Sequence, residues 1–391
     1  MSALHNQMTS RERVHAAAKG LPVDRVPVMY WFNPHAACRL MAEFQASRSR
    51  LKQAAAAGYW KDFKQQGELN APELARTMPH TLNEYANGKY ALEMGADLVI
   101  EPVGAGGNVS RMYWEDGSLR VLDAYHSVRA LGGIYMDVVE PAIKSVDDLK
   151  DYRFPDFTRG KHYAAIRQLR NKYPGASIMM ESFGVQDFFC TQIWAMTPFM
   201  MALYEYPDEV KNYQRRFADW VVDTVALGVR AGADCVFIYD DYGYTGRTLI
   251  SMDMWKEFTY PHLKRIIEAV HEAGALAVLH SCGYQVPFLD YYVEAGLDIL
   301  QAFQPKAGND FAAAYAKYGG RLAFATGIDV QQGEQMSAAQ MRESILDSYR
   351  TGKLHGRHIL SMTHMLQYTM PGENIRAIFD TVREIQAGKH G

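Results

Sequence analysis

The sequence contains little cysteine and no long apolar run. The four cysteines among its 391 residues (Cys38, Cys190, Cys235 and Cys282) lack the paired spacing of a disulfide framework, so we expect a protein of a reducing compartment. No stretch of about 20 apolar residues is present, which argues against a membrane span. Residues 1–13 are polar and lack the apolar core of a signal peptide, so we expect a cytoplasmic location.

Clusters of one charge sign are also missing. Lysine and arginine are scattered along the chain and the formal net charge is only −3, which argues against a nucleic-acid interface or a membrane-binding face. We expect the chain to act on a small molecule or to bind another protein. Hydrophobic residues make up 48% of the sequence, which is enough to bury a substantial core.

No glycine-rich GxGxxG motif follows the first strand-like segment, which argues against a dinucleotide-binding fold. The chain contains eight strand-like segments that alternate with helical ones. The strand-like segments are residues 25–33, 96–102, 176–182, 233–240, 275–281, 297–303, 321–326 and 357–363. This alternation predicts an α/β fold, a (β/α)8 TIM barrel. No linker or low-complexity segment interrupts the chain, so we predict a single domain over residues 1–391.

Residues 104–158 interrupt the alternation between the second and third strands. The pair Asp116-Gly117 is a typical hairpin turn between two apolar runs, and residues 131–133 form a second turn, so we predict an inserted β-hairpin segment here. A helix is expected over residues 72–94, just before the second strand.

A short repeat marks the turns from helix to strand. It reads Gly-Ala-Asp at 95–97 and 232–234, and Gly-Leu-Asp at 296–298. The repeat belongs to the unit of a barrel rather than to a longer duplicated sequence.

The strands end in polar side chains, at the end of a barrel where active sites lie. The fifth strand ends at His280, and alternation places Cys282 on the same face of the strand. An imidazole and a thiol side by side are two ligands for zinc, which needs a third protein ligand in a catalytic site. His364, at the end of the eighth strand, is the first candidate, and Glu181 or an aspartate of the fourth strand is the alternative. The competing interpretation is a core histidine beside a structural thiol.

The fourth strand ends in two adjacent carboxylates, Asp240 and Asp241. Alternation sends one of them into the barrel mouth and the other toward the wall or a loop. Two carboxylates this close repel each other, so the pKa of one should rise, which suits general acid or base catalysis. We therefore expect catalytic roles for Asp240, Asp241 and Glu181. For Asp241 the alternative is that it caps the next loop.

Other residues at or near the strand ends are candidates for binding the substrate. Asn33, Gln304 and Asp329 are polar residues at these ends, and Tyr242 lies in the loop after the fourth strand. Phe32 belongs to a group of aromatic residues that could line an apolar pocket. We expect substrate contacts from these five residues.

Nine segments spread along the chain form a recognisable set. They are residues 9–13, 24–28, 147–155, 232–241, 249–251, 258–261, 279–283, 327–329 and 371–375. Together they resemble the uroporphyrinogen decarboxylase superfamily, and more closely its methyltransferase branch. The resemblance implies a (β/α)8 barrel, in agreement with the strand count.

The two branches of that superfamily differ in their binding residues. The decarboxylases carry an arginine-rich element after the first strand that holds substrate carboxylates, and no arginine stands at residues 29–35 here. The methyltransferases hold zinc with a His-x-Cys pair and a later cysteine. His280 and Cys282 match the pair, and His364 stands in the C-terminal stretch where the later cysteine would be.

The resemblance implies a zinc-dependent methyltransferase that moves a methyl group between a small-molecule donor or acceptor and a corrinoid. The corrinoid-binding motif Asp-x-His-x-x-Gly does not occur in the sequence, so cobalamin would arrive on a separate corrinoid protein. The resemblance also favours a homodimer. Two alternatives are a metal-independent decarboxylase and a non-catalytic binder of a corrinoid or tetrapyrrole.

Overall fold

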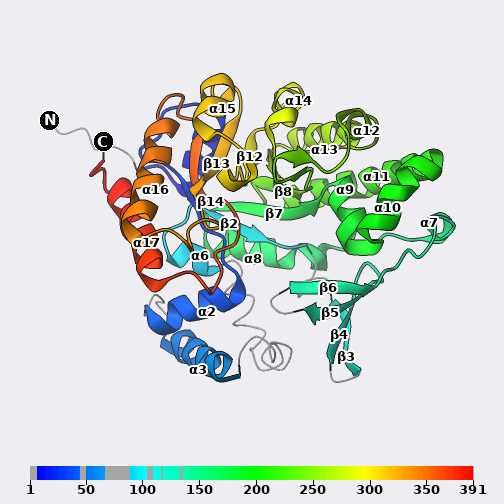
Figure 1. The fold of residues 1–391 in the computed structure, drawn as a ribbon, viewed down its shortest axis with the longest axis horizontal. Helices are drawn as coiled ribbons and strands as arrows, with labels where there is room; N and C mark the ends of the chain where they lie inside the picture. The colour runs from blue at the N-terminus through cyan, green and yellow to red at the C-terminus, as the bar shows by residue number, and fades with distance from the viewer. Residues whose placement is uncertain are drawn as a thin grey trace.

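The computed structural model describes residues 7–44, 50–66, 89–103, 109–115, 118–132 and 135–390. Its centre is a parallel barrel of eight strands (Figure 1), so the α/β barrel expected from the sequence is confirmed. In their order around the barrel, the strands are β1 (Val28–Met29), β14 (His358–Met362), β13 (Ala323–Ile328), β12 (Ile299–Gln301), β11 (Leu276–His280), β8 (Cys235–Tyr239), β7 (Ser177–Phe183) and β2 (Leu98–Glu101). Each of the eight predicted strand segments overlaps one of them.

The barrel is nearly closed between β1 and β2. The Asp97 N–H donates to the Val28 carbonyl at 2.7 Å, and the Val28 N–H donates to the Asp97 carboxylate at 2.9 Å. These two bonds join the start of β1 to the start of β2. The barrel strands are apolar on both faces, since helices cover the outside and side chains fill the inside.

Helices surround the barrel. In the first part of the described chain they are α1 (Ser10–Lys19), α2 (Pro34–Glu43), α3 (Arg50–Gln66), α6 (Tyr90–Glu93), α7 (Asp148–Asp151), α8 (Ala164–Lys172), α9 (Val185–Asp187) and α10 (Met196–Glu205). The others are α11 (Pro207–Ala231), α12 (Met252–Phe258), α13 (Tyr260–Glu272), α14 (Leu289–Glu294), α15 (Phe311–Tyr318), α16 (Ala338–Gly352) and α17 (Gly372–Gln386). α10 and α11 are separate helices, because Pro207 lacks an N–H and disfavours a helical residue before it.

A four-stranded antiparallel sheet stands between β2 and β7. It consists of β3 (Val109–Glu115), β4 (Ser118–Asp123), β5 (Val128–Gly132) and β6 (Tyr135–Glu140), paired in sequence order. The sheet lies apart from the barrel, at the lower right of Figure 1. The insertion therefore has twice the strands of the predicted hairpin. The predicted turn Asp116-Gly117 lies outside the described residues, as does most of the predicted helix at 72–94, which ends in α6.

The barrel interior is filled by alternate side chains of the strands together with small residues of α1. These buried residues are Met29, Leu98, Met179, Cys235, Phe237, Leu276, Val278, Ile299, Ala323, Ala325 and Ile359, with Val14, Ala17 and Ala18 from α1. The same alternation directs Tyr239 and His280 inward at the far ends of β8 and β11. Cys235 is thus a buried core residue, as expected from its early place in its strand.

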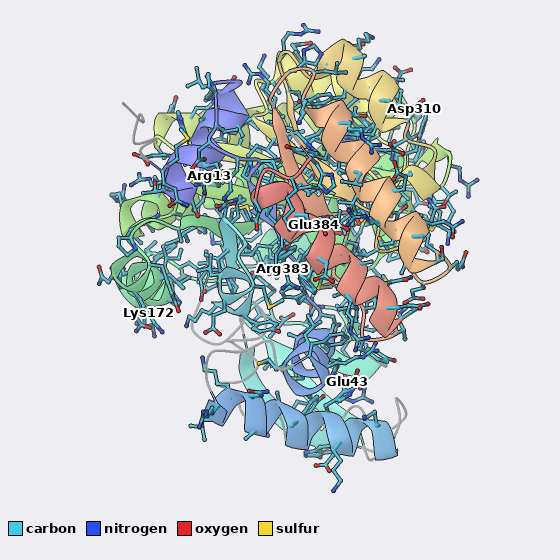
Figure 2. All side chains as sticks on the ribbon, turned by 90° about the vertical axis from the view of Figure 1, so that its left-hand side faces the viewer. Arg13, Glu43, Lys172, Asp310, Arg383 and Glu384 are labelled. Atoms are coloured by element: carbon cyan, nitrogen blue, oxygen red, sulfur yellow. The ribbon has the colours of Figure 1, made fainter. Side chains whose placement is uncertain are left out.

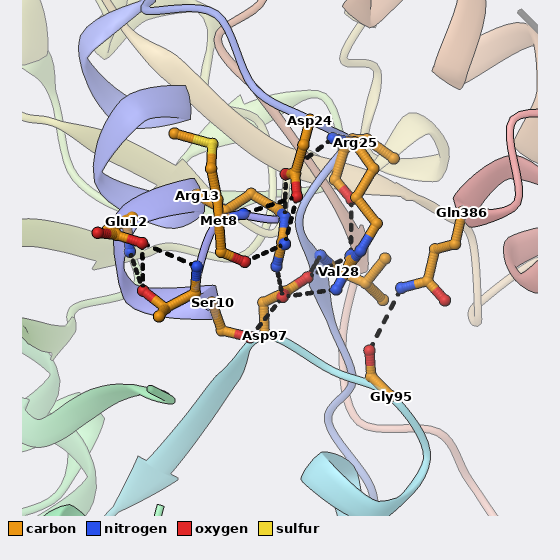
Figure 3. A network of polar contacts seen from close by, with 12 residues as sticks. Met8, Ser10, Glu12, Arg13, Asp24, Arg25, Val28, Gly95, Asp97 and Gln386 are labelled. Carbon is orange, nitrogen blue, oxygen red and sulfur yellow. Dashed lines mark hydrogen bonds and ion pairs between the residues drawn. The ribbon is translucent and has the colours of Figure 1, made fainter. Parts of the chain in front are cut away.

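Charged pairs attach α1 to the N-terminal end of the barrel. The third residue of each Gly-x-Asp repeat accepts a side chain of this helix. The pairs are Arg13–Asp97 at 2.6 Å, Arg11–Asp234 at 2.7 Å and Lys19–Asp298 at 2.5 Å. Each aspartate also accepts a backbone N–H at or next to the start of the preceding barrel strand, from Val28, Ile178 and Ala277 respectively. Figure 3 shows Asp97 between Arg13, Arg25 and Ser10. The aspartates of the repeat therefore attach α1 to the N-terminal end of the barrel.

The C-terminal helix α17 covers one side of the barrel. Figure 2 shows this side, with Arg13 on α1 and with Arg383 and Glu384 on α17. Glu384 accepts from Arg342 of α16 at 2.6 Å, which ties the last two helices together. Within the described ranges, none of the helices has the length and apolar character needed to cross a membrane.

Candidate functional site

Three side chains that could bind a metal meet at the C-terminal mouth of the barrel. His280 ends β11, Cys282 follows it two residues later, and His364 lies two residues after the end of β14. One ligand atom from each lies within 4.8 Å of the others, and the His280 Nε2 to Cys282 Sγ distance is 3.4 Å. The three residues that the sequence analysis named as metal ligands are thus neighbours in the structure.

A sharp turn after Cys282 makes this geometry possible. Gly283 has φ +79°, and a side chain there would collide with the backbone of Gly243. Gly243 belongs to a short hairpin of β9 (Gly243–Tyr244) and β10 (Arg247–Thr248), and Tyr284 N–H donates to the Tyr244 carbonyl at 3.0 Å. Glycine at 283 therefore lets the loop of Cys282 lie directly on the loop after β8.

Aromatic rings form one wall around the histidines. The Trp31 ring stacks on His364 with 5.4 Å between centroids and meets His280 edge-on at 5.2 Å. Tyr239 approaches His280 from β8 at 5.5 Å. These rings keep water from one side of the site and restrict the orientation of both imidazoles.

Burial sets the protonation of the donors. It lowers the pKa of His364 to about 4, with a smaller contribution from His280, so His364 is a neutral imidazole at physiological pH. Burial, assisted by Asp241, raises the pKa of the Cys282 thiol well above its ordinary value. A neutral imidazole is the form that binds a metal, whereas the thiol would be deprotonated by the metal itself.

The donor set fits zinc. Two imidazoles and a thiol suit this borderline metal. Tetrahedral bonds to nitrogen and sulfur place these two atoms about 3.6 Å apart, close to the 3.4 Å between His280 Nε2 and Cys282 Sγ. Only a small movement of His364 is needed to complete the set, because its ligand atom is within 4.8 Å of both.

Two glutamines contact the donors. Gln301, at the end of β12, accepts a hydrogen bond from His280 Nδ1. Gln304 donates from Nε2 to Cys282 Sγ at 3.3 Å. Both glutamines are buried. Gln304 was expected to bind substrate, and in the structure it contacts a proposed metal ligand.

The two adjacent aspartates point in different directions, as alternation predicts. Asp241 lies at the mouth, where its Oδ1 accepts the Cys282 N–H at 2.7 Å and lies 3.9 Å from His280 Nε2. Asp240 is buried in the wall, where it accepts from Tyr242 Oη and from the Asp187 N–H, both at 2.6 Å. Of the pair, Asp241 is therefore the one near the metal donors.

Three carboxyl groups with raised pKa values lie at or just after the C-terminal ends of β7 and β8, and Glu181 among them lines a separate cavity from the one beside the metal donors. Burial raises the pKa of Asp240 to about 7, although its bond from Tyr242 works in the opposite direction. Burial, with Asp241 and Asp240 nearby, raises the pKa of Asp187 well above its ordinary value. Glu181 also reaches about 7, through burial and the charge of Glu101. Asp240 and Glu181 can therefore exchange protons near neutral pH.

Four residues expected to bind substrate have structural contacts of their own. Asn33 caps α2 by accepting the His35 N–H, and Asp329 accepts the backbone N–H groups of two following residues. Phe32 is buried against Tyr30, Tyr90 and Phe379, and Tyr242 donates to Asp240. All four are at least nine-tenths buried. Their roles as substrate contacts stay predictions.

A cavity of about 700 Å³ adjoins the metal donors, large enough for a small-molecule substrate. Cys282, His364 and Gln304 line its inner end. Its other lining residues come from the loops after β8, β12, β13 and β14, and they include Tyr244, Thr245, Lys306, Gln331, Glu334, Met365, Gln367 and Tyr368.

Sequence reasoning missed two contributors to the site. Trp31 was grouped with the other aromatic residues, although it is the ring that contacts both histidines. Asp187 lies on a short helix with no strand-end signal to identify it. Gln301 was visible as the polar residue that ends an apolar strand, but its partner His280 could be known only from the register of β11 and β12.

The fold is a (β/α)8 barrel, and the candidate site lies at its C-terminal mouth. A family model described as uroporphyrinogen decarboxylase (URO-D) matches residues 133–385. The chain belongs to this family, and it is an enzyme of the uroporphyrinogen decarboxylase superfamily.

Relatives include both decarboxylases and a methyltransferase. A uroporphyrinogen decarboxylase of Gloeobacter violaceus is 27% identical over 189 residues, which is 46% of this chain and half of that protein. A uroporphyrinogen decarboxylase of Pelodictyon phaeoclathratiforme is 22% identical over 322 residues, or 76% and 86% of the two chains. The methylcobamide:CoM methyltransferase MtbA of Methanosarcina mazei is 22% identical over 302 residues, or 76% and 77%.

The fold also matches a solved structure. A methyltransferase from Methanosarcina mazei superposes with a TM-score of 0.63 over 96% of this chain and 99% of that one, at 19% identity. This similarity supports the assignment of the barrel fold.

Proposed function

We propose that this enzyme is a zinc-dependent methyltransferase whose metal is held by His280, Cys282 and His364. The observation that carries the proposal is the meeting of these three donor atoms within 4.8 Å at the barrel mouth. Three protein ligands and one open position are what a catalytic zinc requires. When bound, zinc supplies Lewis acidity to the oxygen or sulfur that carries or receives the methyl group.

The acidic residues of the mouth have separate tasks in this proposal. Asp241 fixes the loop of Cys282 by accepting its N–H, and its charge faces His280. Glu181 holds a proton on its carboxyl group and releases it near neutral pH, because its pKa is about 7. Asp240 positions the loops after β7 and β8 through Asp187 and Tyr242.

The cavity supports methyl transfer better than the decarboxylation of a polycarboxylate. Among its described lining residues, Lys306 is the only lysine or arginine and Glu334 is an acid. A substrate with several carboxylates would need more cationic partners than this. The cavity therefore favours a small methyl donor or acceptor with its reacting atom near Cys282 and His364.

The corrinoid in this proposal is carried by a separate protein that docks over the mouth. The related MtbA is named for a methylcobamide substrate. This chain contains no Asp-x-His-x-x-Gly motif of its own to bind cobalamin. The homodimer favoured by the sequence resemblance stays a prediction.

Metal analysis of the purified protein tests the metal site. We expect about one zinc per chain in the parent, loss of zinc in Cys282→Ala, and at least about 100-fold weaker zinc binding in His364→Ala. Cys190→Ala is the matched control, since Cys190 is a half-buried cysteine outside the donor cluster. Equal zinc content in the parent and Cys282→Ala would refute the site.

Chelation separates methyl transfer from the decarboxylase alternative. The proposal predicts that removing zinc abolishes methyl transfer with a corrinoid protein and that adding zinc restores it. A metal-independent decarboxylase would keep releasing carbon dioxide from a carboxylated substrate after chelation. Saturable corrinoid binding with no turnover would instead indicate a non-catalytic binder.

A further inference from the structure

The orientation of the Gln301 side-chain amide is fixed by its second hydrogen bond. Gln301 Nε2 donates to the Met362 carbonyl at 2.9 Å, so Oε1 is the atom that faces His280 Nδ1. An amide oxygen can only accept, so His280 must carry its proton on Nδ1. The lone pair of His280 is then on Nε2, the atom 3.4 Å from Cys282 Sγ.

The side-chain amide of Gln304 is also fixed in orientation, but its nitrogen rather than its oxygen faces the metal donor. Its Oε1 accepts the Gly283 N–H at 3.0 Å, so Nε2 is the atom that faces Cys282 Sγ at 3.3 Å. An amide N–H donated to sulfur stabilises a thiolate more than a thiol. The same Nε2 lies 3.5 Å from the Thr363 carbonyl.

Both amides also reach the segment that carries the third donor. Met362 and Thr363, whose carbonyls accept from Gln301 and Gln304, directly precede His364. Gln301 therefore joins His280 to the end of β14, and Gln304 joins the loop of Cys282 to the same place. All three donors are thus connected through two buried glutamines whose atoms have defined roles.

We propose that Gln301 and Gln304 are positioning residues that prepare the three donors for a metal, an inference that rests on the proposed metal site. Gln301 selects the Nδ1–H tautomer of His280, so that Nε2 is free for the metal. Gln304 holds the Cys282 sulfur in place by donating an N–H to it. Partners of this kind typically change metal affinity 10- to 100-fold when they are removed.

A purely structural role would give a different result. Buried glutamines that only link strands would alter the stability of the barrel and leave the metal affinity of the folded protein unchanged. Thr326 provides the matched control, because its Oγ1 donates to the Phe303 carbonyl at 3.1 Å inside the same barrel wall. Thr326→Val removes one buried hydrogen bond without removing a partner of a metal donor.

The experiment measures zinc affinity by competition with a chromophoric chelator, for full-length variants whose folding is verified by circular dichroism. We expect about 10- to 100-fold weaker binding in Gln301→Leu and about 10-fold weaker binding in Gln304→Leu. Thr326→Val should stay within about twofold of the parent. Gln301→Glu should retain more affinity than Gln301→Leu, because a carboxylate still accepts from Nδ1 but cannot donate to the Met362 carbonyl.

Two spectroscopic readouts separate the two glutamines. Nitrogen NMR of the metal-free parent should show the Nδ1–H tautomer of His280, and Gln301→Leu should show a mixture. With cobalt(II) in place of zinc, the thiolate-to-metal absorption band of Gln304→Leu should move to longer wavelength, since a thiolate without its N–H partner donates charge more readily.

The outcomes distinguish this inference from the proposed function. Zinc bound by the parent with unchanged affinity in both leucine variants would overturn the inference and leave the metal site standing. An equal loss in Thr326→Val would overturn it too, because the effect would then be one of stability. A parent that binds no zinc would overturn both, and an Nε2–H tautomer in the metal-free parent would overturn the role of Gln301 alone.

Discussion

At the N-terminal end of the barrel, buried carboxylates are matched by cations, whereas at the mouth they gather together. Asp97 accepts from Arg13 and Arg25, both within 2.8 Å. At the mouth, Asp187, Asp240 and Asp241 influence one another, and burial leaves the pKa of Asp240 near 7. At the N-terminal end, ion pairs stabilise the fold. At the mouth, burial raises the pKa values of carboxyl groups, which suits them to proton transfer.

Removing Asp97 should have the largest effect on stability. Asp97→Ala removes the buried carboxylate shared by Arg13 and Arg25 and leaves Arg13, which is 2% exposed, with Asp24 as its remaining acidic partner. Loss of one member of a buried pair costs about 3–5 kcal/mol. We expect a corresponding fall in the free energy of unfolding in urea.

The matched control for Asp97 is an exposed pair. Asp147→Ala removes the contact with Lys150 at 3.2 Å, in which both side chains are largely exposed, and it should cost less than about 1 kcal/mol. Zinc content per folded chain should not change in either variant. A loss of zinc in Asp97→Ala would show that the N-terminal end of the barrel also determines metal binding at the mouth.

Replacing Glu181 should change how stability depends on pH. Its pKa is about 7 in the folded protein and ordinary in the unfolded chain, so the folded state binds the proton more tightly. The stability of the parent should therefore fall as the pH rises from about 4.5 to about 7. Glu181→Gln removes this pH dependence. Its free energy of unfolding should exceed that of the parent by up to about 3 kcal/mol at pH 8 and should equal it at pH 4.

Urea unfolding at several pH values measures the Glu181 effect. Part of the pH slope should remain in Glu181→Gln, because Asp240 has a raised pKa of the same kind. Asp147→Asn, at the exposed site, should leave the slope as in the parent. Parallel curves for the parent and Glu181→Gln would show that the carboxyl group is not held protonated by the fold.

The smallest effect is expected at the start of α1. Thr9 caps this helix by accepting the Glu12 N–H at 3.2 Å, and Glu12 accepts the Thr9 N–H at 2.8 Å. Thr9→Ala should cost about 1 kcal/mol, visible as a lower midpoint in urea, and Thr9→Ser should keep most of the stability. A cost as large as that of Asp97→Ala would mean that the cap, and not the ion pairs, attaches α1 to the barrel.

Local pattern predicted most of the fold and part of the site. Eight apolar segments were enough to identify the strands, and the spacing of His280 and Cys282 placed them on one face, because alternation is a local property. The four-stranded insertion was underestimated, since its strands have weak individual signals. Three features of the site could not be predicted, because they depend on strand register and on contacts between loops. They are the bond between His280 and Gln301, the stacking of Trp31 on His364 and the bond from Tyr242 to Asp240.

The anchoring of α1 has a consequence for how the chain reaches its folded state. Arg13 and Lys19 of this helix precede their partners Asp97 and Asp298 by 84 and 279 residues, respectively. The pair between Lys19 and Asp298 can form only after β12 is in place. Contacts of such high sequence separation slow folding and form last. The attachment of α1 is therefore complete only after β12 has joined the barrel, and a chain truncated before β12 should be cleaved more readily by protease near α1.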